Sequence, residues 1–123
     1  MKVYVAGPMR GRVNFNFPLF NAVTKQLREQ GHEVFNPAER DIEKYGECLV
    51  NKAGSIEQAA DEHGFSLNEA LEADMIWICR NAEVVALLPG WRNSKGAKAE
   101  KALAEALGLE IKFLKKTKKG FTF

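Results

Sequence analysis

Two acidic residues, Asp74 and Glu100, fall on helix faces that are otherwise apolar. Asp74 belongs to a stripe with helical spacing, whose other members are Leu67, Ala70, Leu71 and Ile78. Glu100 lies roughly 130° around its helix from the centre of the charged face. A carboxylate on a buried face costs free energy, and acid–base or nucleophilic chemistry is one reason for a protein to keep it, so the pair is a candidate catalytic site. The simpler alternatives are that Glu100 leans to the helix edge and pairs with a lysine, and that Asp74 caps a neighbouring loop.

The segment that carries Glu100 also predicts an anion site. Residues 87–100 read as the end of a buried strand, a turn and the first turns of a helix, with Ser94 as the N-cap and Gly108 as the stop. The free N–H groups of a first helical turn attract anions. A group held by the N–H donors of residues 95–97 would lie roughly 5–8 Å along the axis from Glu100. This is about the span from the 5'-phosphate of a nucleotide to its anomeric carbon.

A second candidate anion site follows the first predicted strand, at residues 2–6. This apolar strand ends in the loop Gly7-Pro8-Met9-Arg10-Gly11-Arg12. Backbone and guanidinium N–H groups in such a loop can bind an anion, although the pattern is neither GxGxxG nor a P-loop. The alternative is a solvated turn with two surface arginines. Just beyond it, Phe15 and Phe17 either stack on a base or belong to a hydrophobic staple or the core.

Alternating strands and helices position these residues. We expect strands at residues 2–6, 32–35, 83–88 and 109–114, whereas residues 121–123 either add a fifth edge strand or dock elsewhere. Helices begin near Pro18, at the Ser66-Leu67-Asn68-Glu69 capping box and after Ser94. The pattern predicts one α/β domain over residues 1–123, a three-layer Rossmann/flavodoxin-like fold with a parallel sheet of four to five strands. Ligands of such folds bind at the carboxyl ends of the strands.

Residues 38–65 are the least readable part of the chain. They are charged and contain three scattered glycines, and Glu57–His63 is a candidate short helix. A long excursion after the second strand is either a lid or binding loop, or a surface insertion.

Composition narrows the class of protein. A chain of 123 residues with 46% hydrophobic and 28% charged residues is typical of one soluble globular domain. A net charge of +2 is too small to argue for nucleic acid, and Lys115-Lys116-Thr117-Lys118-Lys119 reads as a solvated tail. Two distant cysteines and two histidines lack metal-ligand spacing, so no metal site is predicted. Isolated cysteines, no signal peptide and no apolar membrane span predict a cytoplasmic protein.

Three segments match a known pattern. The first is Tyr4-Val5-Ala6-Gly7-Pro8-Met9-Arg10-Gly11, the second runs from Leu87 to Glu100, and the third from Asp74 to Leu88. With them the chain resembles the nucleoside 2-deoxyribosyltransferase superfamily, in particular its small 2'-deoxynucleoside 5'-phosphate N-hydrolases and a related phage and bacterial group. The resemblance covers most of the chain apart from residues 38–65.

The resemblance implies a role for each matching residue. Glu100 stands at the position of the nucleophile, Asp74 at that of the second essential carboxylate and Tyr4 at that of the tyrosine in the first strand. Gly7, Met9, Arg10 and Gly11 match the first nucleotide-binding loop, and Ser94 and Gly96 match the 5'-phosphate site. The resemblance also implies a homodimer or larger homo-oligomer whose copies complete each other's sites, acting without a cofactor.

The residues and the resemblance lead to one hypothesis. Glu100 attacks the anomeric carbon of a (deoxy)nucleoside 5'-monophosphate, Asp74 orients the sugar or handles the proton of the leaving base, and Phe17 contributes to the substrate site. Water completes an N-glycosidase reaction, whereas a second base makes the protein a transferase. The alternative is a nucleotide-binding or signalling module without turnover. A third interpretation, a nucleic-acid accessory protein using Lys115–Lys119, predicts strongly salt-dependent binding.

Overall fold

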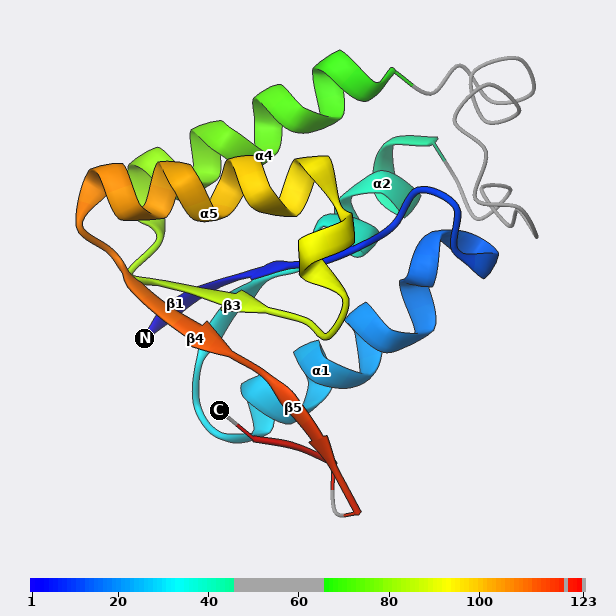
Figure 1. Cartoon of the computed structure of the whole chain (residues 1–123), viewed down its shortest axis with the longest axis vertical. Coiled ribbons are helices and arrows are strands. Elements are labelled where there is room, and N and C mark those ends of the chain that lie inside the picture. Colours follow the sequence, from blue (N-terminus) through cyan, green and yellow to red (C-terminus); the bar gives the residue numbers. More distant parts are fainter. Residues whose placement is uncertain (46–65, 119, 123) are drawn as a thin grey trace.

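The centre of the fold is a four-stranded parallel sheet. The computed structural model describes residues 1–45, 66–118 and 120–122, without the side chains of residues 13, 14 and 45. The strands are β1 (Lys2–Ala6), β2 (Glu33–Phe35), β3 (Val84–Leu87) and β4 (Glu110–Phe113), in the order β2-β1-β3-β4 (Figure 1). Strand β1 pairs in parallel with both β2 and β3, so it is a central strand of the sheet.

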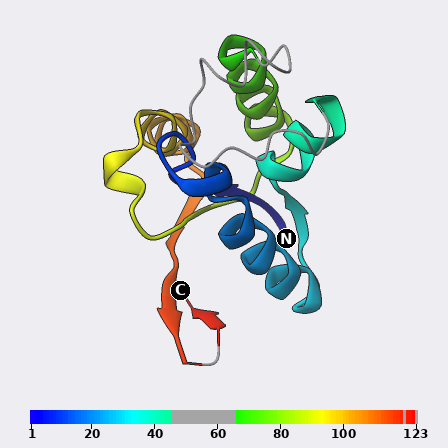
Figure 2. The ribbon, with the colours of Figure 1, turned by 90° about the vertical axis from the view of Figure 1, so that its right-hand side faces the viewer.

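Helices cover both faces of the sheet. Helix α1 (Phe17–Glu29) lies on one face, and helices α4 (Leu67–Asn81) and α5 (Lys95–Leu107) lie on the other (Figures 1 and 2). Successive side chains of β1 alternate between the two layers, because a strand has a period of two. Val3 and Val5 pack with α1, whereas Tyr4 and Ala6 pack on the side of α4 and α5. The three-layer Rossmann/flavodoxin-like prediction is therefore confirmed.

The chain reverses its winding direction between β1 and β3. After β1 it passes through the short 3-10 helix η1 (Val13–Asn16) to α1 on one face. After β3 it passes through the 3-10 helix η3 (Trp91–Asn93) to α5 on the opposite face. The two connections therefore separate at the carboxyl ends of neighbouring strands, which opens a crevice where open α/β sheets bind ligands.

Helix α2 (Pro37–Tyr45) was not predicted from the sequence. It occupies the start of the segment 38–65, for which no structure before Glu57 was assigned. Asn36 begins the helix, because its Oδ1 accepts a 2.8 Å hydrogen bond from the Ala38 N–H, and Pro37 suits the first helical position. The candidate helix Glu57–His63 lies outside the described residues, as do residues 46–65 of the segment that was interpreted as either a lid or binding loop or a surface insertion.

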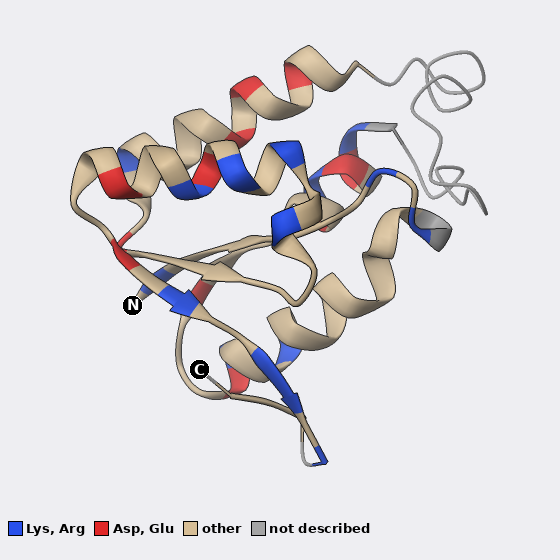
Figure 3. Ribbon diagram, in the orientation of Figure 1, with Lys and Arg blue, Asp and Glu red and all other residues tan. Residues whose placement is uncertain are grey.

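The basic C-terminal segment forms a hairpin. Strands β5 (Lys115–Thr117) and β6 (Gly120–Thr122) pair antiparallel in a separate sheet, so residues 121–123 do not add a fifth strand to the main sheet. Gln26 of α1 anchors the hairpin, accepting a 2.9 Å hydrogen bond from the Phe121 N–H. The segment predicted as a solvated tail is therefore partly a strand. Lys115, Lys116 and Lys118 are nevertheless exposed, and Figure 3 shows basic residues along β5, on the part of the molecule opposite α4.

Candidate functional site

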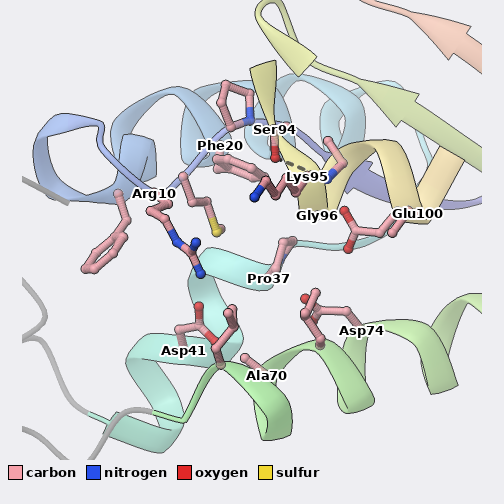
Figure 4. A pocket seen from close by; sticks show the side chains of 18 of the residues that line it. Arg10, Phe20, Pro37, Asp41, Ala70, Asp74, Ser94, Lys95, Gly96 and Glu100 are labelled. Atoms are coloured by element: carbon pink, nitrogen blue, oxygen red, sulfur yellow. Dashed lines mark hydrogen bonds between the residues drawn. The ribbon is translucent and has the colours of Figure 1, made fainter. Parts of the chain in front are cut away.

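A cavity of about 410 Å³ opens at the carboxyl ends of β1 and β3. Its walls are the loop after β1, the first turns of α5, and the facing parts of α2 and α4 (Figure 4). The volume is in the range of sites for small ligands. The predicted residues that line the cavity are Tyr4, Gly7, Met9, Arg10, Phe17, Asp74, Ser94, Gly96 and Glu100. One cavity thus brings together nearly all of the residues selected from the sequence.

Glu100 is buried in this cavity, with 5% of its surface exposed. Its Oε2 accepts a hydrogen bond from the hydroxyl of Tyr4, a fully buried residue of β1. Burial raises the pKa of Glu100 to about 8, although the Tyr4 hydrogen bond opposes the rise. The alternative of a surface ion pair between Glu100 and a lysine is therefore wrong.

Stacked aromatic rings hold Tyr4 in place. Its ring stacks on Phe35 of β2 at 5.5 Å between centroids, and Phe35 stacks in turn on Trp77 of α4 at 5.0 Å. Burial, followed by the negative charge of Glu100, raises the pKa of Tyr4 well above its ordinary value. Tyr4 therefore remains a hydrogen-bond donor at physiological pH, and its rigid position fixes the Glu100 carboxylate.

Asp74 lies on α4 across the cavity from Glu100 (Figure 4). Its Oδ1 is buried and has no hydrogen-bond partner among the described residues. Burial and the nearby charge of Asp41 raise the pKa of Asp74 to about 7, and an interaction with Tyr4 opposes the rise. A buried polar atom without a partner is costly, so this oxygen is available to a ligand in the cavity. The alternative role, a cap for a neighbouring loop, finds no support in these contacts.

Asp41 is a third buried carboxylate of the cavity, and it was not predicted from the sequence. It lies on helix α2, where burial raises its pKa to about 6 against the opposing charge of Arg40. A signal existed in the sequence. Asn36-Pro37 can start a helix as well as end a strand, and Ala38, Asp41 and Ile42 then share one face.

The opposite end of the cavity is suited to an anion. Ser94 caps α5 by accepting a 3.1 Å hydrogen bond from the Ala97 N–H, as predicted. Lys95 and Arg10 line the cavity, and neither has an ion-pair partner in the part of the chain that the structure describes. The positive end of the helix and two available cations thus line the same cavity as the carboxylates.

The three predicted glycines differ in whether the structure would tolerate a side chain at their position. A side chain at Gly7 would approach Leu88 Cβ to 2.7 Å, so the close contact between β1 and β3 requires this glycine. A Cβ at Gly96 would meet Leu71 at an ordinary 3.8 Å, so protein packing does not require glycine there. Gly11 has a φ of +79°, is exposed and does not line the cavity, so its place in the turn gives no support to the predicted substrate contact.

Phe15 and Phe17 are buried in the core on the α1 side of the sheet, as the second of the two alternatives predicted. They also line the cavity, so the core and the binding wall share these rings. Only 5% of Phe15 and 8% of Phe17 is exposed, so little of either ring is free to stack on a base.

The part of the chain that the structure describes contains neither a membrane-spanning helix nor a metal cluster. Among the described residues, no helix is long and apolar enough to cross a membrane. Nor does the described part of the chain contain a group of three His, Cys, Asp or Glu residues placed to hold a metal ion.

Comparison with known proteins gives a family without a described activity. No curated protein and no solved structure matches the chain. The family model described as a domain of unknown function, DUF4406, matches residues 1–113, and the chain therefore belongs to the DUF4406 family.

Proposed function

We propose that the protein is a nucleotide N-glycosidase, which cleaves the bond between base and sugar in a (deoxy)nucleoside 5'-monophosphate. The observation that carries the proposal is the arrangement of Glu100, held by Tyr4, opposite the unpartnered oxygen of Asp74 within one cavity. Most enzymes that cleave glycosidic bonds use two carboxyl groups, one on each side of the bond. The resemblance to nucleoside 2-deoxyribosyltransferases supports the same assignment.

The anion-binding end of the cavity supports a phosphorylated substrate. A 5'-phosphate would accept hydrogen bonds from the first turn of α5 and neutralise Arg10 and Lys95. Glu100 follows Gly96 by one helical turn, which corresponds to about 6 Å along the axis. A nucleotide with its phosphate at the start of α5 would therefore present its anomeric carbon to the Glu100 carboxylate.

The reaction proceeds in two steps. The ionised Glu100 carboxylate attacks the anomeric carbon, the C–N bond breaks with its electron pair going to the base, and protonated Asp74 supplies the proton to the base. Water then attacks the glycosyl ester while the Asp74 carboxylate accepts its proton, which releases the sugar phosphate and restores Glu100. A second base in place of water would give the transferase reaction. Tyr4 orients Glu100 throughout by its hydrogen bond.

Base release is the direct test. Wild-type protein is incubated with a panel of deoxy- and ribonucleoside 5'-monophosphates, and free bases are separated by chromatography. We expect release from at least one nucleotide and none with Glu100→Gln, because the amide cannot attack the sugar. Glu105→Gln, an exposed position on the same helix, is the matched control and should retain activity. Lack of release from every nucleotide would contradict the proposal.

A nucleotide-binding module without turnover is the second candidate. It is favoured by the raised pKa of Glu100, since a carboxyl group with a pKa of about 8 is mostly protonated at neutral pH. Thermal shift with the same nucleotides separates the two candidates. Nucleotide binding without base release, with the same thermal shift in Glu100→Gln as in wild type, would identify a binding module. The implied homo-oligomer is a separate prediction, which light scattering would test.

A further inference from the structure

The wall of the cavity that faces Glu100 combines apolar surface with one additional carboxylate. Figure 4 shows Glu100 on one side, and Asp41, Ala70 and Asp74 on the other. The apolar part of this wall comes from Pro37 of α2 and from residues of α4, namely Leu67, Ala70 and Leu71. A flat heterocycle fits such a surface, whereas a phosphate or a free sugar would gain little from it.

The proposed chemistry determines which part of the substrate meets this wall. In a displacement at the anomeric carbon, the nucleophile and the leaving group occupy opposite faces of the sugar. Because Glu100 approaches from α5, the base must leave toward α2 and α4. The groups on that wall are therefore those that contact the base.

Asp41 has an oxygen available for such a contact. Its Oδ1 lies 3.4 Å from Nη1 of Arg40, and no other hydrogen bond in the described residues reaches this carboxylate. The ion pair with Arg40 offsets part of this charge, but Asp41 is only 5% exposed, so water compensates the rest poorly. A ligand that donates a hydrogen bond would compensate it better.

We propose that Asp41 selects nucleotides whose base carries an exocyclic amino group, such as cytosine or adenine. This inference rests on the proposed function of the cavity. An ionised carboxylate accepts hydrogen bonds but donates none, so it matches an amino group and opposes a carbonyl oxygen at the same place. Bases with a carbonyl in that position, such as uracil and hypoxanthine, would leave two acceptors facing each other without water between them.

The expected discrimination is large. Sites built to hydrogen-bond one substrate group reject analogues that lack it by more than a shape-based pocket can, about 100-fold or more in kcat/KM. At pH 7.5 Asp41 is mostly ionised, because its pKa is about 6. Its charged form, the one that excludes carbonyl bases, is then the prevailing form.

The test compares pairs of substrates that differ only in this group. Relative kcat/KM is measured at pH 7.5 for dCMP against dUMP and for dAMP against dIMP, with wild type and Asp41→Asn. The Asn amide offers both a donor and an acceptor, so we expect the ratio to fall from about 100-fold to below about tenfold. Glu43→Gln removes a carboxylate from an exposed position of the same helix and should keep the wild-type ratio.

Binding to the Glu100→Gln variant separates failure of this inference from failure of the proposed function. Base release without preference for amino bases, or with a preference unchanged by Asp41→Asn, would overturn the role of Asp41 and leave the glycosidase intact. No release from any nucleotide, with amino-base binding that Asp41→Asn equalises, would overturn the glycosidase and retain the role of Asp41. No binding of any of the four nucleotides would overturn both.

Discussion

The hydroxyl of Tyr4 donates a hydrogen bond to Oε2 of Glu100, which links the central strand β1 to helix α5 across 96 positions of the sequence. Both groups are buried, and stacked rings of Phe35 and Trp77 restrict Tyr4 from the other side. Such a bond specifies both the position of the carboxylate and one of its hydrogen-bonding directions. Glu100 also lines the ligand cavity, so its carboxylate is within reach of the substrate in the proposed reaction.

Removing this donor should weaken catalysis more than stability. Tyr4→Phe keeps the stacked ring but loses the hydroxyl, so Glu100 loses the hydrogen bond that opposes the rise of its pKa. We expect kcat/KM to fall about 10- to 100-fold, as typical for one group that positions a catalytic residue. The measurement is base release against pH. A decrease in activity without a shift of the Glu100 ionisation to higher pH would contradict this role.

The pH dependence of kcat/KM should report two carboxyl groups. Glu100 must be ionised, so activity rises with pH through its pKa of about 8, and Asp74 must be protonated, so activity falls as pH rises through about 7. The plot of kcat/KM against pH is therefore bell-shaped, with its maximum between about pH 7 and 8. Because the two carboxyl groups interact, its two apparent pKa values describe the pair and not either residue alone. Asp74→Asn should leave a weaker activity that only rises with pH. A bell that persists in this variant would assign the second ionisation to another group.

Stability of the ligand-free protein should fall as pH rises. The pKa of Glu100 in the folded protein, about 8, exceeds its ordinary value of 4.5. The folded state therefore binds a proton that the unfolded state has lost, and this stabilisation is complete below about pH 4.5 and lost through pH 8. Denaturant unfolding should show Glu100→Gln more stable than wild type at pH 9 by up to about 5 kcal/mol, with no such gain at pH 4.

The exposed Glu105 provides the control for this measurement. Glu105→Gln removes a carboxylate from an exposed position of the same helix and should not reproduce the gain in stability that Glu100→Gln shows at pH 9. If Glu100→Gln follows the wild-type slope instead, the carboxylate is not the source of the dependence.

Helical spacing was enough to find Asp74 and Glu100, because each stands on a face whose other residues are apolar. Ser94 and Gly108 act as the N-cap and C-cap of α5, which their residue types predicted. The sheet followed from short apolar runs alternating with helical patterns. These features are local, so a single sequence contains them.

Features that depend on long-range contacts were beyond the sequence. The hydrogen bond of Tyr4 with Glu100 requires two segments far apart in the chain, and only the family resemblance suggested that both serve the site. Asp41, by contrast, had a local signal, and it was missed because Asn36-Pro37 was interpreted as the end of the strand at residues 32–35 and not also as a helix start. The hairpin of β5 and β6 was missed because a run of lysines is typical of a solvated segment. The hydrogen bond from the Phe121 N–H to Gln26, which anchors the hairpin, is not visible in the sequence.

Lys95 should bind the phosphate of the substrate, whereas Lys98 should not. Both are exposed lysines of α5, but only Lys95 lines the cavity. Lys95→Gln should raise the KM for a nucleoside monophosphate about tenfold and the KM for the nucleoside much less, because one charged contact to phosphate is lost. Lys98→Gln is the matched control. Equal effects of the two variants would indicate general attraction by the helix, which high salt would remove in both.

Gly96 offers a substitution that should separate stability from binding. Glycine within a helix costs about 0.5–1 kcal/mol relative to alanine, and an added Cβ would make an ordinary 3.8 Å contact with Leu71. Gly96→Ala should therefore stabilise the ligand-free protein. The same methyl group would occupy the place where a phosphate approaches the first turn of α5, so we expect weaker binding of monophosphates by calorimetry. Unchanged affinity in a stabilised variant would mean that the phosphate lies elsewhere, and that the cavity binds its ligand from the α2 and α4 wall alone.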